Sequence, residues 1–276
     1  MKKLLLIFIA LPMIGFGQNV NIPDANFKAY LVGNSAINTN GDTEIQVSEA
    51  AAWPYYLDVS YFNISDLTGI EAFTSLPQLY CVDNQLTSLD VSNNTALTEL
   101  HCFDNQLTSL DVSGATALIL LRCYGNQLTS LDVSQNINLT ALECDHNELT
   151  NLNLSNNTSL GYLQCDQNHP LVCLNIANGN NTNLSLFAID NPNLNCIEVD
   201  SIANTSTFGV DPQVSFNTNC NNDCSATSTS TLYVYENKSN LVKITDMLGQ
   251  ETPYRRNTPL LYIYDDGTVE KRIVIE

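Results

Sequence analysis

Apolar residues recur in one fixed order every 21 residues through the middle of the chain. The repeat reads L-x-C-x-x-N-x-L-x-x-L-[DN]-[VL]-S-x-x-x-x-L-x-x and begins at Leu79, Leu100, Leu121, Leu142 and Leu163. In each copy apolar residues alternate twice, at L-x-C and at L-x-V, and such alternation is typical of short extended segments with one inward face. We therefore expect a mainly β solenoid, with two parallel strand ladders on opposite sides and little helix.

The segments around the regular copies indicate six parts. Residues 1–17 combine Lys2 and Lys3 with an apolar run and small residues, as in a secretory signal peptide. Residues 18–56, with a short apolar helix around Phe27, and residues 201–224 are expected to cap a solenoid of about seven coils at 57–200, because terminal coils need cover. Residues 225–231 are small and polar, as in linkers. Residues 232–276 alternate as in a small all-β domain with a turn at Asp265-Asp266-Gly267.

A period of 20 to 29 residues with regular leucines and one fixed asparagine is the signature of leucine-rich repeats. The copies resemble the short leucine-rich repeats of secreted Bacteroidota proteins, and the resemblance covers most of the chain. Residues 244–250, 262–267 and 271–276 resemble the type A sorting domain of the type IX secretion system. This second resemblance implies export across the outer membrane by the type IX machinery, and a secreted or cell-surface location.

Charge narrows the range of partners. Residues 18–224 contain two basic residues, Lys28 and Arg122, and 22 acidic ones, a net charge of about −20. Nucleic acids bind through Lys and Arg, so a nucleic-acid partner is not expected. Beyond the signal peptide no apolar run is long enough to span a membrane. Cations and cationic surfaces are the favoured partners.

The nine cysteines fall into two groups. Cys81, Cys102, Cys123, Cys144 and Cys165 occupy an inward strand position, where we expect a stack of buried free thiols in preference to bridges or a metal site, because stacked side chains do not point at one another. The other four lie off this stack toward the C-terminal cap, which gains most from cross-linking. At least one disulfide is expected there, with Cys173–Cys196 and Cys220–Cys224 as one of three complete pairings.

Two further columns repeat with the coils. Asn84, Asn105, Asn126, Asn147 and Asn168 are expected to turn inward and satisfy backbone groups, because buried amides need partners. Asp90, Asp111 and Asp132, continued by Asn153, form an outward column. Its carboxylates either keep the sheet edge soluble or hold cations, and we expect the first.

The segment 38–49 has the spacing of a calcium-binding loop of the EF-hand type. Such loops place oxygen ligands at positions 1, 3 and 5, use a carbonyl at 7 and end in a glutamate at 12. The residues that would supply the ligands here are Asn38, Asn40, Asp42, Glu44 and Glu49. Calcium is the one cofactor that the sequence suggests. The alternative, which we favour, is a cap turn of the same shape that needs no ion.

Function is expected at the variable outward positions on either side of each repeat cysteine. Aromatic residues and arginine there have the composition of interface anchors. The expected binding face contains Tyr80, Val82, His101, Phe103, Arg122, Tyr124, Glu143 and Asp145. His101, His146 and His169 fall in different columns and have no nucleophile at a telling spacing, so no enzyme is expected. We expect a binding or adhesion protein for a protein or glycan; the alternative is an acidic coat component bridged by divalent cations.

Overall fold

Two short helices and two faces of stacked strands make up the main body of the molecule. The computed structural model describes residues 17–202, 205, 208–220, 224, 241–245, 260–264 and 269–272. The predicted signal peptide up to residue 16, the predicted linker at 225–231 and the predicted turn at 265–267 lie outside the described residues. The chain divides into two compact units, residues 1–226 and 227–276.

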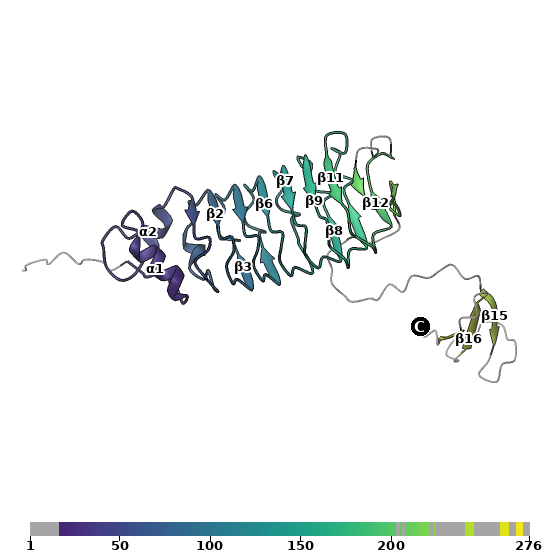
Figure 1. Cartoon of the computed structure of the whole chain (residues 1–276), viewed down its shortest axis with the longest axis horizontal. Helices are drawn as coiled ribbons and strands as arrows, with labels where there is room; N and C mark the ends of the chain where they lie inside the picture. Colours follow the sequence, from purple (N-terminus) through teal and green to yellow (C-terminus); the bar gives the residue numbers. More distant parts are fainter. Residues whose placement is uncertain are drawn as a thin grey trace, which may run out of the picture. The chain divides into compact units, whose positions relative to one another are not determined.

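One face of the first unit is an eight-stranded parallel sheet that runs along the solenoid, which makes about seven coils (Figure 1). In the three-residue strands of this sheet the middle residue is buried in the core and the first and third residues lie on the outward side, as the alternation predicted. The strands in order are β1 (Leu57–Asp58), β2 (Gln78–Tyr80), β4 (Glu99–His101), β6 (Leu120–Arg122), β7 (Ala141–Glu143), β9 (Tyr162–Gln164), β11 (Ser185–Ala188) and β13 (Gly209–Val210).

The other face carries a second strand in most coils; residues 130–132 are not a strand, and they separate two sheets. These strands form a two-stranded and a four-stranded sheet, so that both sides of the solenoid are extended as expected. They are β3 (Ser88–Asp90) and β5 (Ser109–Asp111), then β8 (Asn151–Asn153), β10 (Cys173–Asn175), β12 (Cys196–Glu198) and β14 (Ser215–Asn217). The sheets thus continue through β13 and β14 into the segment that the sequence assigned to the C-terminal cap.

Asparagine side chains join each coil to the one before it. The Asn126 amide donates to the carbonyl of Cys102 in the preceding coil (3.1 Å) and to that of Cys123 in its own (3.1 Å), while its Oδ1 accepts from the Leu107 N–H (2.9 Å). The equivalent bonds recur at Asn84, Asn105, Asn147 and Asn168. The predicted inward, backbone-satisfying role of this column is confirmed.

The outward Asp column closes turns. The Oδ1 atoms of Asp90, Asp111 and Asp132 each accept from the backbone N–H two residues later, at 2.8 to 2.9 Å, and Asn153 does the same at 3.1 Å. Hydrogen bonds from the hydroxyl and the N–H of Ser113 lower the pKa of Asp111. One carboxylate oxygen of each aspartate therefore has a structural partner, a role that neither sequence alternative included.

The N-terminal cap contains α1 (Ala25–Gly33) and α2 (Val47–Ala52), and a short 3-10 turn, η1 (Ile70–Ala72), follows in the first coil. The predicted helix around Phe27 is α1, which buries Phe27 and Leu31. Asp24 connects this cap to the solenoid: one carboxylate oxygen accepts from the first turn of α1 and the other from the N–H and hydroxyl of Ser65, both at 2.9 Å. In the part of the chain that the structure describes, no helix has the length and apolar character needed to cross a membrane.

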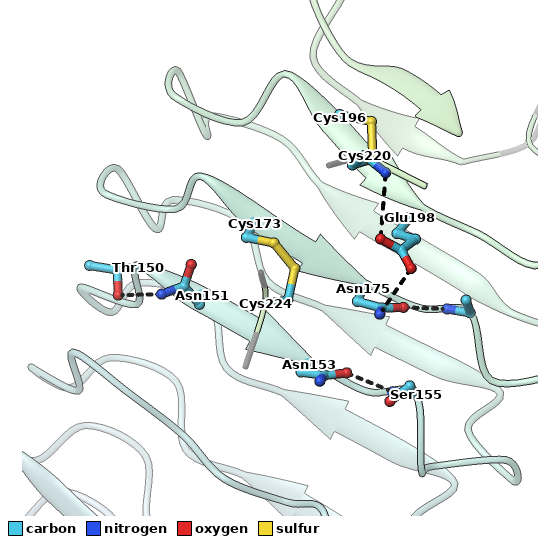
Figure 2. Close-up of a disulfide and its surroundings, with 11 residues drawn as sticks. Thr150, Asn151, Asn153, Ser155, Cys173, Asn175, Cys196, Glu198, Cys220 and Cys224 are labelled. Carbon is cyan, nitrogen blue, oxygen red and sulfur yellow. Dashed lines mark hydrogen bonds between the residues drawn. A yellow bond between two sulfur atoms is a disulfide. The ribbon is translucent and has the colours of Figure 1, made fainter. Parts of the chain in front are cut away.

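Two disulfides fasten the C-terminal end (Figure 2). They join Cys173 to Cys224 and Cys196 to Cys220, so at least one bridge is confirmed, but the pairing named from the sequence is wrong. Cys173 and Cys196 occupy matching positions of the neighbouring strands β10 and β12. Their side chains therefore stack side by side and do not point at each other. Instead, Cys220 bonds to Cys196 in the β12 coil, and Cys224 bonds to Cys173 in the β10 coil.

The five repeat cysteines are free and fully buried. The Cys81 thiol lies 3.5 Å from the carbonyl oxygen of His101 in the next coil. Burial raises the pKa of every one of these thiols, so they stay neutral. The expected buried thiol stack is confirmed.

The second unit contributes an antiparallel sheet of β15 (Leu241–Thr245), β16 (Leu260–Tyr264) and β17 (Val269–Arg272). This agrees with a small all-β domain. The sorting role of the domain stays a prediction.

Asn126→Ala is expected to destabilise the solenoid by about 2 to 4 kcal/mol, because the Leu107 N–H loses its acceptor and the Cys102 and Cys123 carbonyls each lose one of two asparagine donors. Urea denaturation followed by circular dichroism measures the change. Asn138→Ala is the matched control, since its exposed side chain makes one bond, to the Thr116 carbonyl, and we expect less than about 0.5 kcal/mol there. Equal losses in the two variants would contradict the inter-coil role.

Thiol titration tests the division of the cysteines. Without reductant, the denatured chain is expected to show five reactive thiols, and the native chain none, because the repeat cysteines are buried. Reduction before denaturant is expected to raise the count to all nine. A count near zero in the denatured, unreduced chain would show that the stacked thiols are bridged.

Candidate functional site

Strand register sets the outward side chains of the eight-stranded sheet in columns. From β2 to β9 each strand pairs with the next without a shift, so equivalent residues lie side by side, about 4.8 Å apart. The residues before the repeat cysteines form one column, Tyr80, His101, Arg122, Glu143 and Gln164. The residues after the cysteines follow in the same coils: Val82, Phe103, Tyr124, Asp145 and Asp166.

Two pairs of rings stack along these columns. Tyr80 lies on His101 with ring centroids 4.5 Å apart and an interplanar angle of 21°, and Phe103 lies on Tyr124 at 4.3 Å and 14°. All but His101 are half-buried, so ring edges and faces remain open to solvent. The structure thus brings together the aromatic residues predicted for the binding face, as one stack in each column.

Three of the eight predicted face residues are not open to solvent. Val82, His101 and Asp145 are each only 6% exposed, so the prediction that these three side chains face solvent is wrong. The reason is the short distance between coils, which lets a large neighbour cover the next side chain, as Tyr80 covers His101. Tyr80, Phe103, Arg122, Tyr124 and Glu143 remain at the surface.

Charged groups follow the rings along the same face. Arg122 Nε donates to Glu143 Oε1 at 3.0 Å, so the one arginine of the solenoid is paired within its own column. Burial raises the pKa of Asp145, although its hydrogen bond to His146 Nδ1 (2.8 Å) acts in the opposite direction. The face therefore passes from aromatic rings to carboxylates.

His101 lies where the aromatic and charged parts meet. Burial, together with the positive charge of Arg122, lowers its pKa, although the nearby Glu99 acts to raise it, so the ring is neutral at neutral pH. Its Nε2 atom is buried without a hydrogen-bond partner, and Glu99 Oε2 lies 3.6 Å away. The hydroxyl of Tyr80 donates to that same carboxylate oxygen at 3.4 Å.

Two groups of surface residues were not predicted from the sequence. The first strand positions form a third outward column, Gln78, Glu99, Leu120, Ala141 and Tyr162, which the same alternation could have revealed. The second group is aromatic and lies around the first coil, where the Tyr56 ring packs edge-on against Tyr80 at 6.2 Å and Trp53 against Tyr55 at 5.3 Å. A run of aromatic residues at 53–56 was the available signal.

Hydrogen bonds within the loop 38–49 occupy the oxygens proposed for calcium. Glu49 Oε1 accepts from the N–H groups of Thr39 (2.8 Å) and Asn40 (3.1 Å), and Oε2 accepts from the Gln46 N–H (3.0 Å). Asp42 accepts from Asn40 and Gln46, while Asn38 is buried. Glu44 forms an ion pair with Lys28 at 2.7 Å.

These contacts describe the cap turn that was the alternative to a calcium site. Among the described residues, no group of three or more His, Cys, Asp or Glu side chains is arranged to hold a metal ion. Burial acts to raise the pKa of Glu49, but the hydrogen bonds from Gln46, Thr39 and Asn40 outweigh it and hold the pKa below its usual value. A cap turn that needs no ion stays our prediction.

We expect millimolar calcium to leave the melting temperature unchanged, because an ion would have to replace the hydrogen bonds of Glu49. The lowered pKa of Glu49 means that its contribution is present above the unfolded-state pKa and is lost as pH falls through the folded-state value. Glu49→Gln is therefore expected to lower the melting temperature at neutral pH and to weaken its dependence on acid. Differential scanning calorimetry measures both.

Glu71→Gln is the control, since Glu71 lies in the first coil and outside this loop. A calcium-dependent rise in the melting temperature that Glu49→Gln abolishes would establish the ion site instead.

Comparison with known proteins identifies the architecture. No family model matches the chain, and no curated protein matches it in sequence. Among solved structures, the functional domain of InlJ from Listeria monocytogenes, which includes a cysteine ladder, matches with a TM-score of 0.57 and 34% identity over 72% of this chain. The match covers 48% of that domain, so the chain spans about half of its length.

Two more distant structures also match. Internalin C2 from L. monocytogenes has a TM-score of 0.45 and 20% identity, over 71% of this chain and 94% of its own. A leucine-rich repeat protein from Bacteroides thetaiotaomicron has a TM-score of 0.42 and 18% identity, over 59% of this chain and 23% of its own. With its 21-residue period, paired strands and inward asparagines, the chain has the fold of leucine-rich repeat proteins.

Proposed function

We propose that this protein is a secreted or surface-displayed binding module, and not an enzyme, that contacts a protein partner through the outward face of its eight-stranded sheet. The observation that carries the proposal is the alignment of Tyr80, Phe103, Tyr124 and Arg122 on one face. Rings at such positions are not required to build a coil, because Gln164 and Asp166 occupy the same positions in a later coil.

The composition of this face is closer to that of a protein interface than to that of an ordinary solvent-exposed surface. Tyrosine and arginine are over-represented among residues that dominate binding energy, and half-buried rings are already ordered by stacking. Order before binding lowers the entropy lost on association. The carboxylates at Glu143 and Asp166 add charge complementarity to a basic partner.

Two disulfides and the export signals predicted at the two ends of the chain support a location outside the cytoplasm. Two disulfides persist where the environment is oxidising. The signal peptide predicted at 1–17 and the type IX sorting domain predicted at 232–276 would supply the route of export. These two assignments remain part of the proposal.

Site-specific photo-cross-linking tests the proposed face. The full-length protein carries a photoreactive phenylalanine analogue at position 124 and is incubated with surface proteins of the producing cells and with proteins of their environment. A discrete cross-linked protein is expected from position 124, and Phe103→Ala is expected to remove it, because Phe103 stacks on that ring. The same analogue at position 137 is the control, since Ile137 is an exposed apolar residue in a turn away from this sheet.

Two results would overturn the protein-binding proposal. A glycan-array signal that Phe103→Ala removes, without any cross-linked protein, would assign the face to a glycan. Self-association that depends on divalent cations, without either signal, would favour the acidic coat component.

A further inference from the structure

A shallow depression lies beside the ring stacks on the outward face. It forms in the third outward column, where Ala141 stands between Leu120 and Tyr162 on the neighbouring strands. Alanine is the smallest side chain of that column, so the surface drops between its larger neighbours. The rim is completed by Glu99, Ile119, Arg122, Thr140 and Glu143.

The depression combines an apolar floor with a charged rim. Leu120 and Ala141 supply the floor, and Ile119 beside them is 44% exposed. The Tyr162 hydroxyl bonds to Gln164 Oε1 at 2.8 Å, which holds the phenol in place at one end. An apolar floor with a negative rim suits a side chain that has a long aliphatic stem and a cationic head.

Glu99 is the carboxylate of this rim that lacks a cationic partner. Arg122 is already bonded to Glu143, and the Nε2 atom of the neutral His101 lies 3.6 Å from Glu99 Oε2. The His101 side chain is 7% exposed and this nitrogen has no hydrogen-bond partner. The Glu99 side chain is 33% exposed, so its carboxylate is open to a cationic group that comes from outside.

We propose that this depression receives a single lysine or arginine side chain of the partner protein. The aliphatic stem lies along Ala141 and Leu120 from the Tyr162 end, and the cationic head lies at the Glu99 carboxylate, three strands from Tyr162. The net charge of about −20 over residues 18–224 attracts such a partner, and the depression selects one side chain of it. The proposal rests on the proposed function of this face in protein binding.

Nuclear magnetic resonance of the full-length, nitrogen-15-labelled protein tests this site. The probe is Nα-acetyl-lysine methylamide, and Nα-acetyl-norleucine methylamide is the neutral analogue with the same four-carbon stem and no ammonium group. Saturable shifts at the amides of Leu120, Ala141 and Tyr162 are expected with the lysine probe and not with the norleucine probe. Shifts of equal size with both probes would overturn the proposal, because the carboxylate would then contribute nothing.

Two variants separate the site from general attraction to an acidic surface. Ala141→Leu fills the depression without a change of charge, and the equivalent Leu120 shows that the strand accepts leucine. Glu99→Gln removes the unpaired carboxylate. Each is expected to weaken lysine binding roughly tenfold, or about 1.4 kcal/mol, whereas Asp132→Asn, an equal loss of charge outside this column, is expected to leave binding unchanged.

The outcomes distinguish this inference from the proposed function. If a partner still cross-links at position 124 but the lysine probe gives only diffuse shifts that Ala141→Leu does not alter, the depression is not a lysine or arginine site and the binding face stands. If the lysine probe saturates but nothing cross-links at position 124, the proposed protein partner fails. Saturable shifts with calcium in place of lysine would also overturn the inference.

Discussion

An asparagine amide that bonds to two coils at once, where each coil leaves its strand of the eight-stranded sheet, is the interaction on which the stacked structure depends. Asn105 shows the arrangement: its Nδ2 donates to Cys81 in the preceding coil and to Cys102 in its own, while its Oδ1 accepts from the Leu86 N–H. These backbone carbonyls and this N–H lie where the chain leaves a strand, so they have no hydrogen-bond partner in a strand ladder. Because an unsatisfied buried polar group costs about 1 to 3 kcal/mol, an asparagine there holds neighbouring coils in one register.

That register decides what the surface can do. Equal coils keep each column straight, so one residue type per coil becomes a row of side chains about 4.8 Å apart. Rings at that spacing stack, as Phe103 and Tyr124 do, and opposite charges pair, as Arg122 and Glu143 do. A single small residue in a row, Ala141, leaves a depression. The surface therefore derives from the order of residues down a column, which the linear sequence separates by 21 positions.

The sequence predicts the scaffold because the scaffold repeats. The inward asparagines, the buried cysteines and both strand ladders each recur often enough to reveal their side of the coil. Burial of His101 and Val82 depends instead on which neighbour lies in the next coil, so alternation alone misassigned them. The disulfide partners depend on the path of the terminal segment, and no repeat describes that path. Left-handed backbone recurs two residues after each repeat cysteine, at Asp83, Asp104, Gly125, His146 and Gln167. Because it recurs at one place in the repeat, it could have been predicted from the sequence.

The division between repeated and variable positions also separates stability from recognition. Leu120 and Ala141 occupy the same place in consecutive coils, as do Arg122 and Glu143, and each coil closes around the same buried leucine and cysteine. Replacing an outward residue therefore leaves the inter-coil bonds intact, whereas replacing an inward asparagine breaks them. The outward residues of an acidic face with one paired arginine can therefore change to suit a basic partner without loss of the fold. Like charges spread along a solenoid repel one another less than they would in a compact core.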